Sequence, residues 1–288
     1  MAGSEGGYRY SDCLFWCYNS IVAIFLILTG QQVDQRWALF SSNVGLILLS
    51  VVIIRVYWQR PEYRLFRFAR NWYPFFYFSY LHWESGMLRH LFHPHSFDTL
   101  VKYWDLAIFG DYLHNILYQF QPVWFAECIH FTYFFYYILI FLTGLLLYRS
   151  DVRDYKQYIF DIGVLYLAHY TVFYIFPVVG PIDLHLARFP DGVIFIPLMK
   201  ILYKVGDSPG GAMPSSHVSV AVLAWVWLYR YNKKLAMGAS VFTVSLIFST
   251  VYLSYHYAID AVAGFIVGVV FVVFMYFLRR RFGEESFM

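Results

Sequence analysis

The residues best suited to chemistry are His256 and Asp260, which lie four positions apart near the end of the chain. On a helix, this spacing places both side chains on one face, one turn apart. The Asp260 carboxylate can then accept a hydrogen bond from one ring nitrogen of His256, which fixes the tautomer and leaves the other nitrogen as a nucleophile. A negative charge in the first helical turn is also favoured by the helix dipole. This pair therefore suits nucleophilic catalysis.

A second group of candidates begins with glycines and a proline at residues 210–214 and continues with Ser215, Ser216 and His217. This composition indicates a loop that enters a helix, with a serine as N-cap. The free N–H groups and the dipole at such a helix start favour a bound phosphate. We expect Ser215 and Ser216 to contact that phosphate and His217, in the first turn, to face it.

Membrane-spanning helices must position these residues. Of the 288 residues, 60% are hydrophobic and 14% are charged, whereas a soluble domain carries about 25% charged residues. The mean hydropathy of +0.53 also predicts an all-α, polytopic membrane helix bundle. The segment 92–121 is too polar to span and is expected in the interface, and 179–213 is expected to be a long loop. Eight apolar runs are predicted to span: 14–30, 41–58, 72–91, 123–148, 158–178, 215–231, 235–255 and 256–278.

The distribution of lysine and arginine predicts the orientation, because short loops rich in these residues stay on the cytoplasmic side. With all such loops placed there, eight spans close consistently and both termini are cytoplasmic. The helix start at Ser215 and the turn at His256 then share the extracytoplasmic or lumenal face. A lone histidine there is more often structural than catalytic, but two histidines and a carboxylate at one face favour a functional site. The basic clusters are 60–70, 149–156, 230–234 and 279–281.

Both motifs resemble signature motifs of a known family. Residues 214–217 (Pro-Ser-Ser-His) and the spacing of serine, histidine and aspartate in 249–260 resemble the second and third motifs of the type 2 phosphatidic acid phosphatase superfamily. Those motifs read P-S-G-H and S-R-x5-H-x3-D. The resemblance implies a six-helix membrane core, here a catalytic domain at 61–288, preceded by a two-span extension at 1–60.

The same resemblance implies metal-free phosphoryl transfer on a phospholipid or sphingolipid drawn from the bilayer, with no cofactor. His256 would attack phosphorus, Asp260 would orient His256, and His217 would protonate the leaving oxygen. His217 would then activate water or an acceptor hydroxyl against the phosphohistidine.

Two departures from the family pattern concern positive charge. Thr250 stands where the third motif has arginine, and the first motif, K-x6-R-P, is missing from the sequence. Arg188 and Lys204 are the candidate phosphate-binding cations that remain. A phosphodiester carries one negative charge and needs fewer cations than a phosphomonoester. This favours phosphoinositol-type head-group transfer to a lipid alcohol, as in the similar inositol phosphorylceramide and sphingomyelin synthases.

Two other readings stay open: a phosphatidate-type lipid phosphomonoester phosphatase, and a catalytically degenerate lipid-binding membrane protein. Metal binding is not expected. The Glu127/His130 pair is a single E-x-x-H motif, whereas a di-iron bundle uses two, so a polar contact inside the bundle is the simpler interpretation. The basic residues lie in short loops rather than along one face, which argues against nucleic-acid binding. Nothing in the sequence indicates an oligomeric state.

Overall fold

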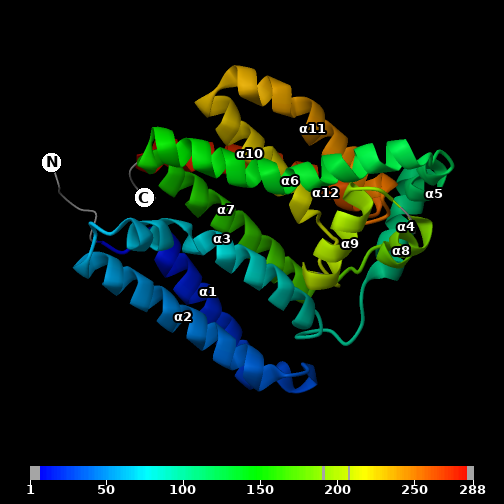
Figure 1. Ribbon diagram of the computed structural model, residues 1–288. Helices are drawn as coiled ribbons and strands as arrows, with labels where there is room; N and C mark the ends of the chain where they lie inside the picture. Colours follow the sequence, from blue (N-terminus) through cyan, green and yellow to red (C-terminus); the bar gives the residue numbers. More distant parts are fainter. Residues whose placement is uncertain (1–6, 190–191, 207, 284–288) are drawn as a thin grey trace.

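The computed structural model describes residues 7–189, 192–206 and 208–283, and it consists mainly of helices (Figure 1). Within these ranges the only strand-like pairing is an isolated bridge between Val178 and Gly211. The predicted all-α class is therefore confirmed. The helices are α1 (Tyr10–Leu28), the 3₁₀ helix η1 (Gly30–Gln32), α2 (Arg36–Gln59), α3 (Arg64–Met87), α4 (Asp98–Phe109), α5 (Leu113–Tyr118), α6 (Val123–Ser150), α7 (Val152–Ile175), α8 (Ile182–Arg188), α9 (Phe195–Gly206), α10 (Ser216–Tyr231), α11 (Lys233–Tyr252) and α12 (Ala258–Phe282).

Six of the described helices are long and apolar enough to cross a membrane, namely α1, α2, α6, α7, α11 and α12. The chain is thus an integral membrane protein. The other two predicted spans, 72–91 and 215–231, correspond to α3 and α10, which do not meet this standard. Helix α10 has 16 residues, fewer than the roughly 20 that a bilayer requires. Helix α3 contains polar residues such as Arg70 and Glu84, which lower its mean hydropathy and are buried inside the bundle.

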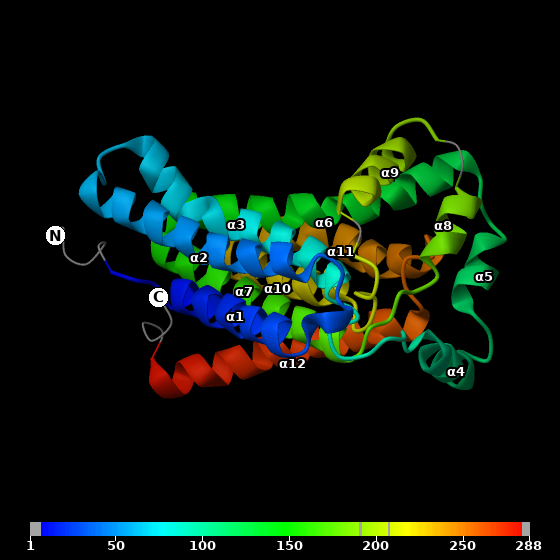
Figure 2. The same ribbon diagram turned by 90° about the horizontal axis from the view of Figure 1, so that it is seen from below.

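Helix α10 lies at the centre of the bundle, in contact with α6, α7, α11 and α12, while α1 packs on α2 and α7. Figure 2 shows both chain ends at one end of the bundle and α4, α5, α8 and α9 at the other. The segment 92–121 forms the short helices α4 and α5. The prediction of one long loop at 179–213 was incomplete, because this segment contains α8 and α9.

A buried ion pair joins α1 to α3. Arg70 donates hydrogen bonds to both carboxylate oxygens of Asp12, at 2.9 and 2.6 Å, and the Tyr73 hydroxyl donates to the same carboxylate. Nearby, Nη2 of Arg9 donates to Oδ1 of Asn71 at 2.7 Å. Since a buried charge is costly unless it is paired, this network fixes the register of the first helix against the bundle.

Two glycines allow α12 to approach α10 closely. A Cβ atom at Gly264 would lie 2.4 Å from the carbonyl oxygen of Ser215, and one at Gly268 would lie 2.9 Å from the carbonyl oxygen of Ser219. The backbone N–H of Ser215 also donates to the carbonyl oxygen of Asp260 at 3.0 Å. The start of α12 is thereby held beside the start of α10, which brings the two sequence motifs together.

Candidate active site

Ser215 connects the two motifs. It is the N-cap of α10, as predicted, and its Oγ accepts a hydrogen bond from the backbone N–H of Val218 at 3.5 Å. The same oxygen lies 3.1 Å from Nε2 of His256. Both Ser215 and Ser216 are buried. The helix start and the imidazole therefore share one hydrogen-bonding group inside the bundle.

His256 is held in a tight turn between α11 and α12. The backbone N–H groups of Tyr255 and His256 both donate to the carbonyl oxygen of Thr250 at 3.0 Å. Ser254 has a φ of 59°, in the left-handed region that few residues other than glycine adopt. The backbone is thus constrained on both sides of the imidazole, which limits the directions in which His256 can point.

His185 on α8 supports this turn from outside. Its Nδ1 donates to the carbonyl oxygen of Leu253 at 2.7 Å, and its ring centre lies 4.3 Å from that of Tyr255. Burial lowers the pKa of His185 to about 3, because the charged form loses its hydration. His185 is therefore neutral at physiological pH and supports the turn as a hydrogen-bond donor rather than as a cation.

Asp260 lies one turn beyond His256, as the sequence spacing suggested. Its Oδ2 accepts a hydrogen bond from the backbone N–H of Tyr257 at 2.9 Å and so caps the start of α12. The same oxygen is 3.6 Å from Nδ1 of His256, slightly beyond hydrogen-bonding distance. Nδ1 of His256 has no other hydrogen-bond partner among the described residues, so Asp260 is the acceptor placed nearest to this nitrogen.

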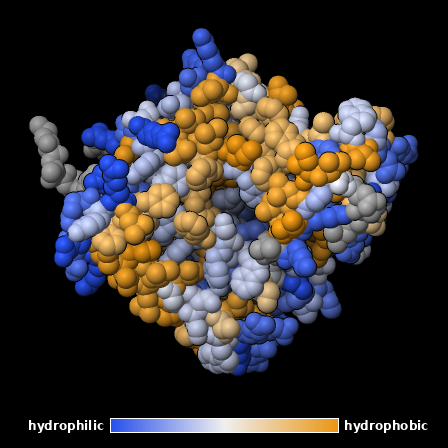
Figure 3. Space-filling view, viewed as in Figure 1, coloured by the Kyte–Doolittle hydropathy of each residue, from blue (hydrophilic) through white to orange (hydrophobic). Residues whose placement is uncertain are grey.

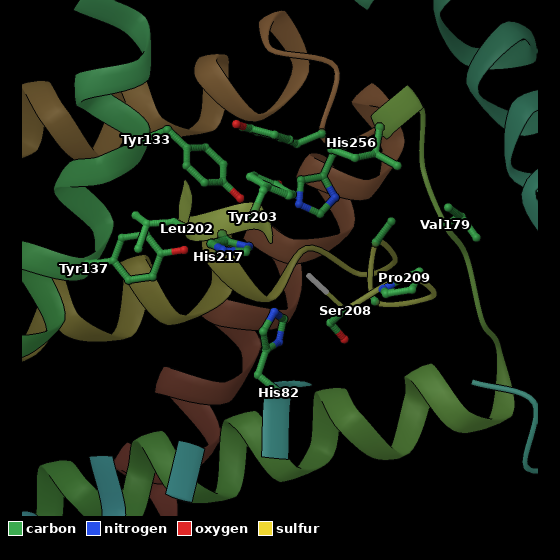
Figure 4. Close-up of a pocket in the computed structure, with 14 residues that line it drawn as sticks. His82, Tyr133, Tyr137, Val179, Leu202, Tyr203, Ser208, Pro209, His217 and His256 are labelled. Atoms are coloured by element: carbon green, nitrogen blue, oxygen red, sulfur yellow. The ribbon is translucent and has the colours of Figure 1, made fainter. Parts of the chain in front are cut away.

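His217 and His256 face a common pocket (Figure 4). Their ring centres are 6.1 Å apart. The rings of Tyr133 and Tyr136 pack on His217 with centre-to-centre distances of 5.1 and 4.7 Å. Nδ1 of His217 has no hydrogen-bond partner within the described part of the chain. His217 thus has a buried ring nitrogen whose hydrogen-bonding capacity is not used by the described residues.

The pocket lies between α3, α6 and α9, next to the start of α10. Figure 3 shows a hollow near the middle of this flank of the bundle, bordered by apolar and weakly polar residues. The lining residues are His82, Tyr133, Tyr137, Val179, Ile182, Leu202, Tyr203, Ser208, Pro209, Gly211, Ala212, His217, Tyr255 and His256. The hollow seen in this view therefore lies on the side of the helix bundle.

The sequence analysis missed His82, the third histidine of this pocket. It lies on α3, and its ring centre is 6.3 Å from that of His217. The hydroxyl groups of Ser85 and Ser208 are 2.8 Å apart and connect α3 to the loop before α10. In the sequence His82 is one histidine in an aromatic run, and only its position within the membrane run could have marked it as a candidate.

The structure does not bring the two candidate cations to the pocket. Nη1 of Arg188 donates to the carbonyl oxygen of His114 at 2.9 Å and to Oγ of Ser254 at 2.8 Å. Its guanidinium also lies 4.5 Å from the ring centre of Tyr118. Arg188 thereby connects α8 to α5 and to the turn before His256. Lys204 is exposed on α9 and is not among the lining residues.

Positive charge is scarce around this site. Of the described residues that line the pocket, none is lysine or arginine. Thr250, which replaces the arginine of the family motif, is buried, and its hydroxyl donates to the carbonyl oxygen of Ile247 at 2.8 Å. Three histidines, His82, His217 and His256, are the ionisable side chains of the described walls that can carry positive charge.

The E-x-x-H pair on α6 has structural contacts. The Glu127 carboxylate accepts hydrogen bonds from the backbone N–H groups of Ile194 and Phe195, at 3.1 and 2.6 Å, and so caps the start of α9. Nδ1 of His130 lies 2.7 Å from the carbonyl oxygen of Ala126. Within the described ranges, no group of three or more histidine, cysteine, aspartate or glutamate residues is arranged to hold a metal ion.

Comparison with known proteins adds one match. A family model described as the PAP2 superfamily matches residues 103–274, which is more than half of the chain and includes His217, His256 and Asp260. No curated protein and no solved structure matches the chain.

Proposed function

The chain belongs to the PAP2 superfamily, whose members are generally phosphatases or phosphotransferases, and on that premise we propose that it transfers a phospholipid head group to a lipid alcohol. Residues 61–288 would form the catalytic domain and residues 1–60 a two-span extension. The observation that carries the proposal is one pocket that contains both motif histidines and, among its described lining residues, no lysine or arginine.

In the first step, Nε2 of His256 attacks phosphorus and the bond between phosphorus and the diacylglycerol oxygen breaks. With a proton on Nδ1, which faces Asp260 at 3.6 Å, Nε2 carries the lone pair, and it would attack once the Ser215 hydroxyl turns away from it. Protonated His217 gives its proton to the leaving oxygen. The products are diacylglycerol and a phosphodiester-like phosphohistidine that still carries the head group.

In the second step, His217, now neutral, takes the proton of an acceptor hydroxyl, and that oxygen attacks phosphorus. The bond between phosphorus and Nε2 of His256 breaks, which regenerates the free imidazole. Ser215 and Ser216, at the N-terminus of α10, would hold the phosphate oxygens in both steps through a hydroxyl and backbone N–H groups. The proton that His217 loses in the first step is recovered in the second.

The charge of the pocket supports a diester donor. A phosphomonoester near neutral pH is close to a dianion and requires several cationic contacts. The described walls offer no lysine or arginine and so fit the single negative charge of a phosphodiester better. Phosphoinositol is the head group that we favour, on the family resemblance, with a ceramide or diacylglycerol as acceptor, and the site would face the extracytoplasmic or lumenal side.

Hydrolysis of a lipid phosphomonoester is the second candidate, and Arg89 is the observation in its favour. A Cβ atom at Gly210 would lie 2.8 Å from Cβ of Arg89, so this side chain packs against the loop that precedes α10. Its Nη1 donates to the carbonyl oxygen of Gly86 at 2.9 Å. Its Nε also donates to Nε2 of His90 at 3.1 Å, so release of both bonds would leave a cation beside the loop that could bind a doubly charged phosphate.

The test uses the purified protein in detergent with three lipid conditions: phosphatidylinositol with ceramide or with a diacylglycerol of different acyl chains, phosphatidylinositol alone, and phosphatidic acid alone. Head-group transfer predicts a new phospholipid only in the first condition. Release of inorganic phosphate from phosphatidic acid would establish the hydrolase instead. His256→Ala is expected to abolish turnover in either case, by more than roughly 10³-fold. Turnover that persists in this variant would exclude the phosphohistidine route, and lack of turnover by the wild type would favour the degenerate lipid-binding protein.

A further inference from the structure

A second groove lies at the opposite end of the bundle from the active-site pocket. It is formed by the middle of α7 and the C-terminal halves of α10 and α12, whereas His217 and His256 lie where α10 and α12 begin. Figure 2 shows the C-terminal half of α12 near the chain termini, away from α8 and α9. One wall is apolar and includes Leu223, Val272 and Met275. The catalytic mechanism makes no use of this groove.

A buried polar cluster forms the base of the groove. Nη2 of Arg279 donates to Oδ1 of Asp161, and the indole N–H of Trp227 donates to Oδ2 of Asp161 at 3.0 Å. Arg279 is 7% exposed and Asp161 is 1% exposed. Nε of Arg279 is nevertheless without a hydrogen-bond partner among the described residues. A buried donor without a partner is costly, so Arg279 has unused capacity to bind an acceptor.

Two further arginines line the mouth of the groove. The guanidinium of Arg230 lies 4.4 Å from the ring centre of Trp227, and that of Arg279 lies 5.5 Å from it. Arg280 also lines the groove. Among the described residues that line the groove, three guanidiniums face one carboxylate, which leaves two positive charges uncompensated. Like charges brought together in this way repel one another unless an anion lies between them.

We propose that this groove binds the head-group phosphate of an anionic phospholipid, with its acyl chains along the apolar wall of α10 and α12. Guanidinium groups bind phosphate oxygens in pairs with charge-assisted hydrogen bonds, and basic pockets between membrane helices suit anionic lipid head groups. The apolar wall directly below the arginines distinguishes a lipid from a free phosphate, because free phosphate has no group to cover that wall. The bound lipid is a structural or regulatory partner, separate from the substrate.

The experiment measures lipid binding to the full chain by native mass spectrometry. The protein is titrated with phosphatidylglycerol, with phosphatidylcholine of the same acyl chains, and with soluble glycerophosphoglycerol. The test variant is Arg230→Gln/Arg280→Gln, which leaves the buried Arg279–Asp161 pair intact. The matched control is Lys233→Gln/Lys234→Gln, which removes the same charge from exposed positions at the start of α11, outside the groove.

We expect phosphatidylglycerol to bind the wild type and the control equally. It should bind the test variant roughly 10- to 30-fold more weakly, since each arginine near the surface raises the affinity for an anionic lipid by about tenfold or less. Equal binding to the test variant and the control would overturn the proposal, as would equal binding of phosphatidylcholine. Displacement of the lipid by glycerophosphoglycerol at the same concentration would show a phosphate site without a lipid component. Because His256→Ala leaves the groove unchanged, lipid binding in that variant separates this proposal from the proposed catalysis.

Discussion

Oγ of Ser215 lies 3.1 Å from Nε2 of His256, so one hydroxyl both caps α10 and contacts the proposed nucleophile. These residues are 41 positions apart in the chain. When a phosphate oxygen enters the pocket, the hydroxyl can turn from the imidazole to the phosphate and free the Nε2 lone pair. In the proposed mechanism, this contact would connect the stability of α10 to the availability of the Nε2 lone pair of His256.

Replacement of Ser215 should therefore reduce both stability and turnover. Ser215→Ala removes a helix cap, which costs about 1 kcal/mol, and also removes the partner of His256. The control is Asn232→Ala, which removes the cap of α11, where Oδ1 of Asn232 accepts from the backbone N–H of Leu235 at 3.1 Å. We expect similar losses of thermal stability in both variants and a loss of turnover in Ser215→Ala alone. Equal turnover in the two variants would separate Ser215 from the chemistry.

His217 should matter most when the leaving group is a poor one. His217→Gln is expected to slow transfer from a phospholipid by roughly 10²- to 10⁴-fold, since this is the usual contribution of a general acid or base. In an aryl phosphodiester, the acidic phenol leaves without being protonated. The first step with this donor should therefore be nearly unaffected by the substitution. The measurement is the burst of phenol that is released before the lipid alcohol acceptor is added. A loss of the same size with both donors would assign His217 a binding role instead of proton transfer.

His82 should select the charge of the substrate. His82→Asn is expected to lower kcat/KM for a phosphodiester by roughly 10- to 150-fold, because hydrogen bonds to charged groups contribute about 1.5–3 kcal/mol. His82→Arg adds a fixed cation on α3 and should raise the ratio of monoester to diester turnover. The two donors are compared at equal acyl chain length. An unchanged ratio in His82→Arg would place His82 outside the phosphate-binding part of the pocket.

The close approach of α10 and α12 gives a test that does not touch a polar side chain. Gly264→Ala places a Cβ 2.4 Å from the carbonyl oxygen of Ser215, so the two helices must separate and the contact between Ser215 and His256 must lengthen. We expect a lower melting temperature and a loss of turnover. Gly238→Ala on α11 is the control, since no described atom lies within 4 Å of its added Cβ. It should leave both properties intact or raise stability slightly.

Local patterns in the sequence predicted much of the site. The four-residue spacing of His256 and Asp260 and the N-cap at Ser215 follow from helix geometry over a few residues, and both are found. The count of eight spans predicted that both motifs share one membrane face; the structure places the starts of α10 and α12 side by side, although six of the described helices meet the criteria for a span. Each of these predictions depends on the spacing of nearby residues or on the direction of the chain, and both can be read directly from the sequence.

The rest depends on contacts between distant segments. His82 reaches the pocket because α3 packs beside the loop that precedes α10, and no pattern near His82 encodes that packing. Arg188 was a reasonable phosphate ligand by charge and loop position, but its guanidinium is engaged by His114 and Ser254. Helices α8 and α9 were missed because each is short, and short apolar runs do not distinguish a helix from a loop.

The hollow in Figure 3 lies on the flank of the bundle, and the pocket is lined by residues of α3, α6 and α9. The lipid substrates that we propose would reach this site by diffusion in two dimensions, and their effective concentration would be a mole fraction within one leaflet. Inert lipid added to the membrane would dilute donor and acceptor together and slow a two-substrate transfer with the square of the dilution. A change in the volume of surrounding buffer would leave the rate unchanged.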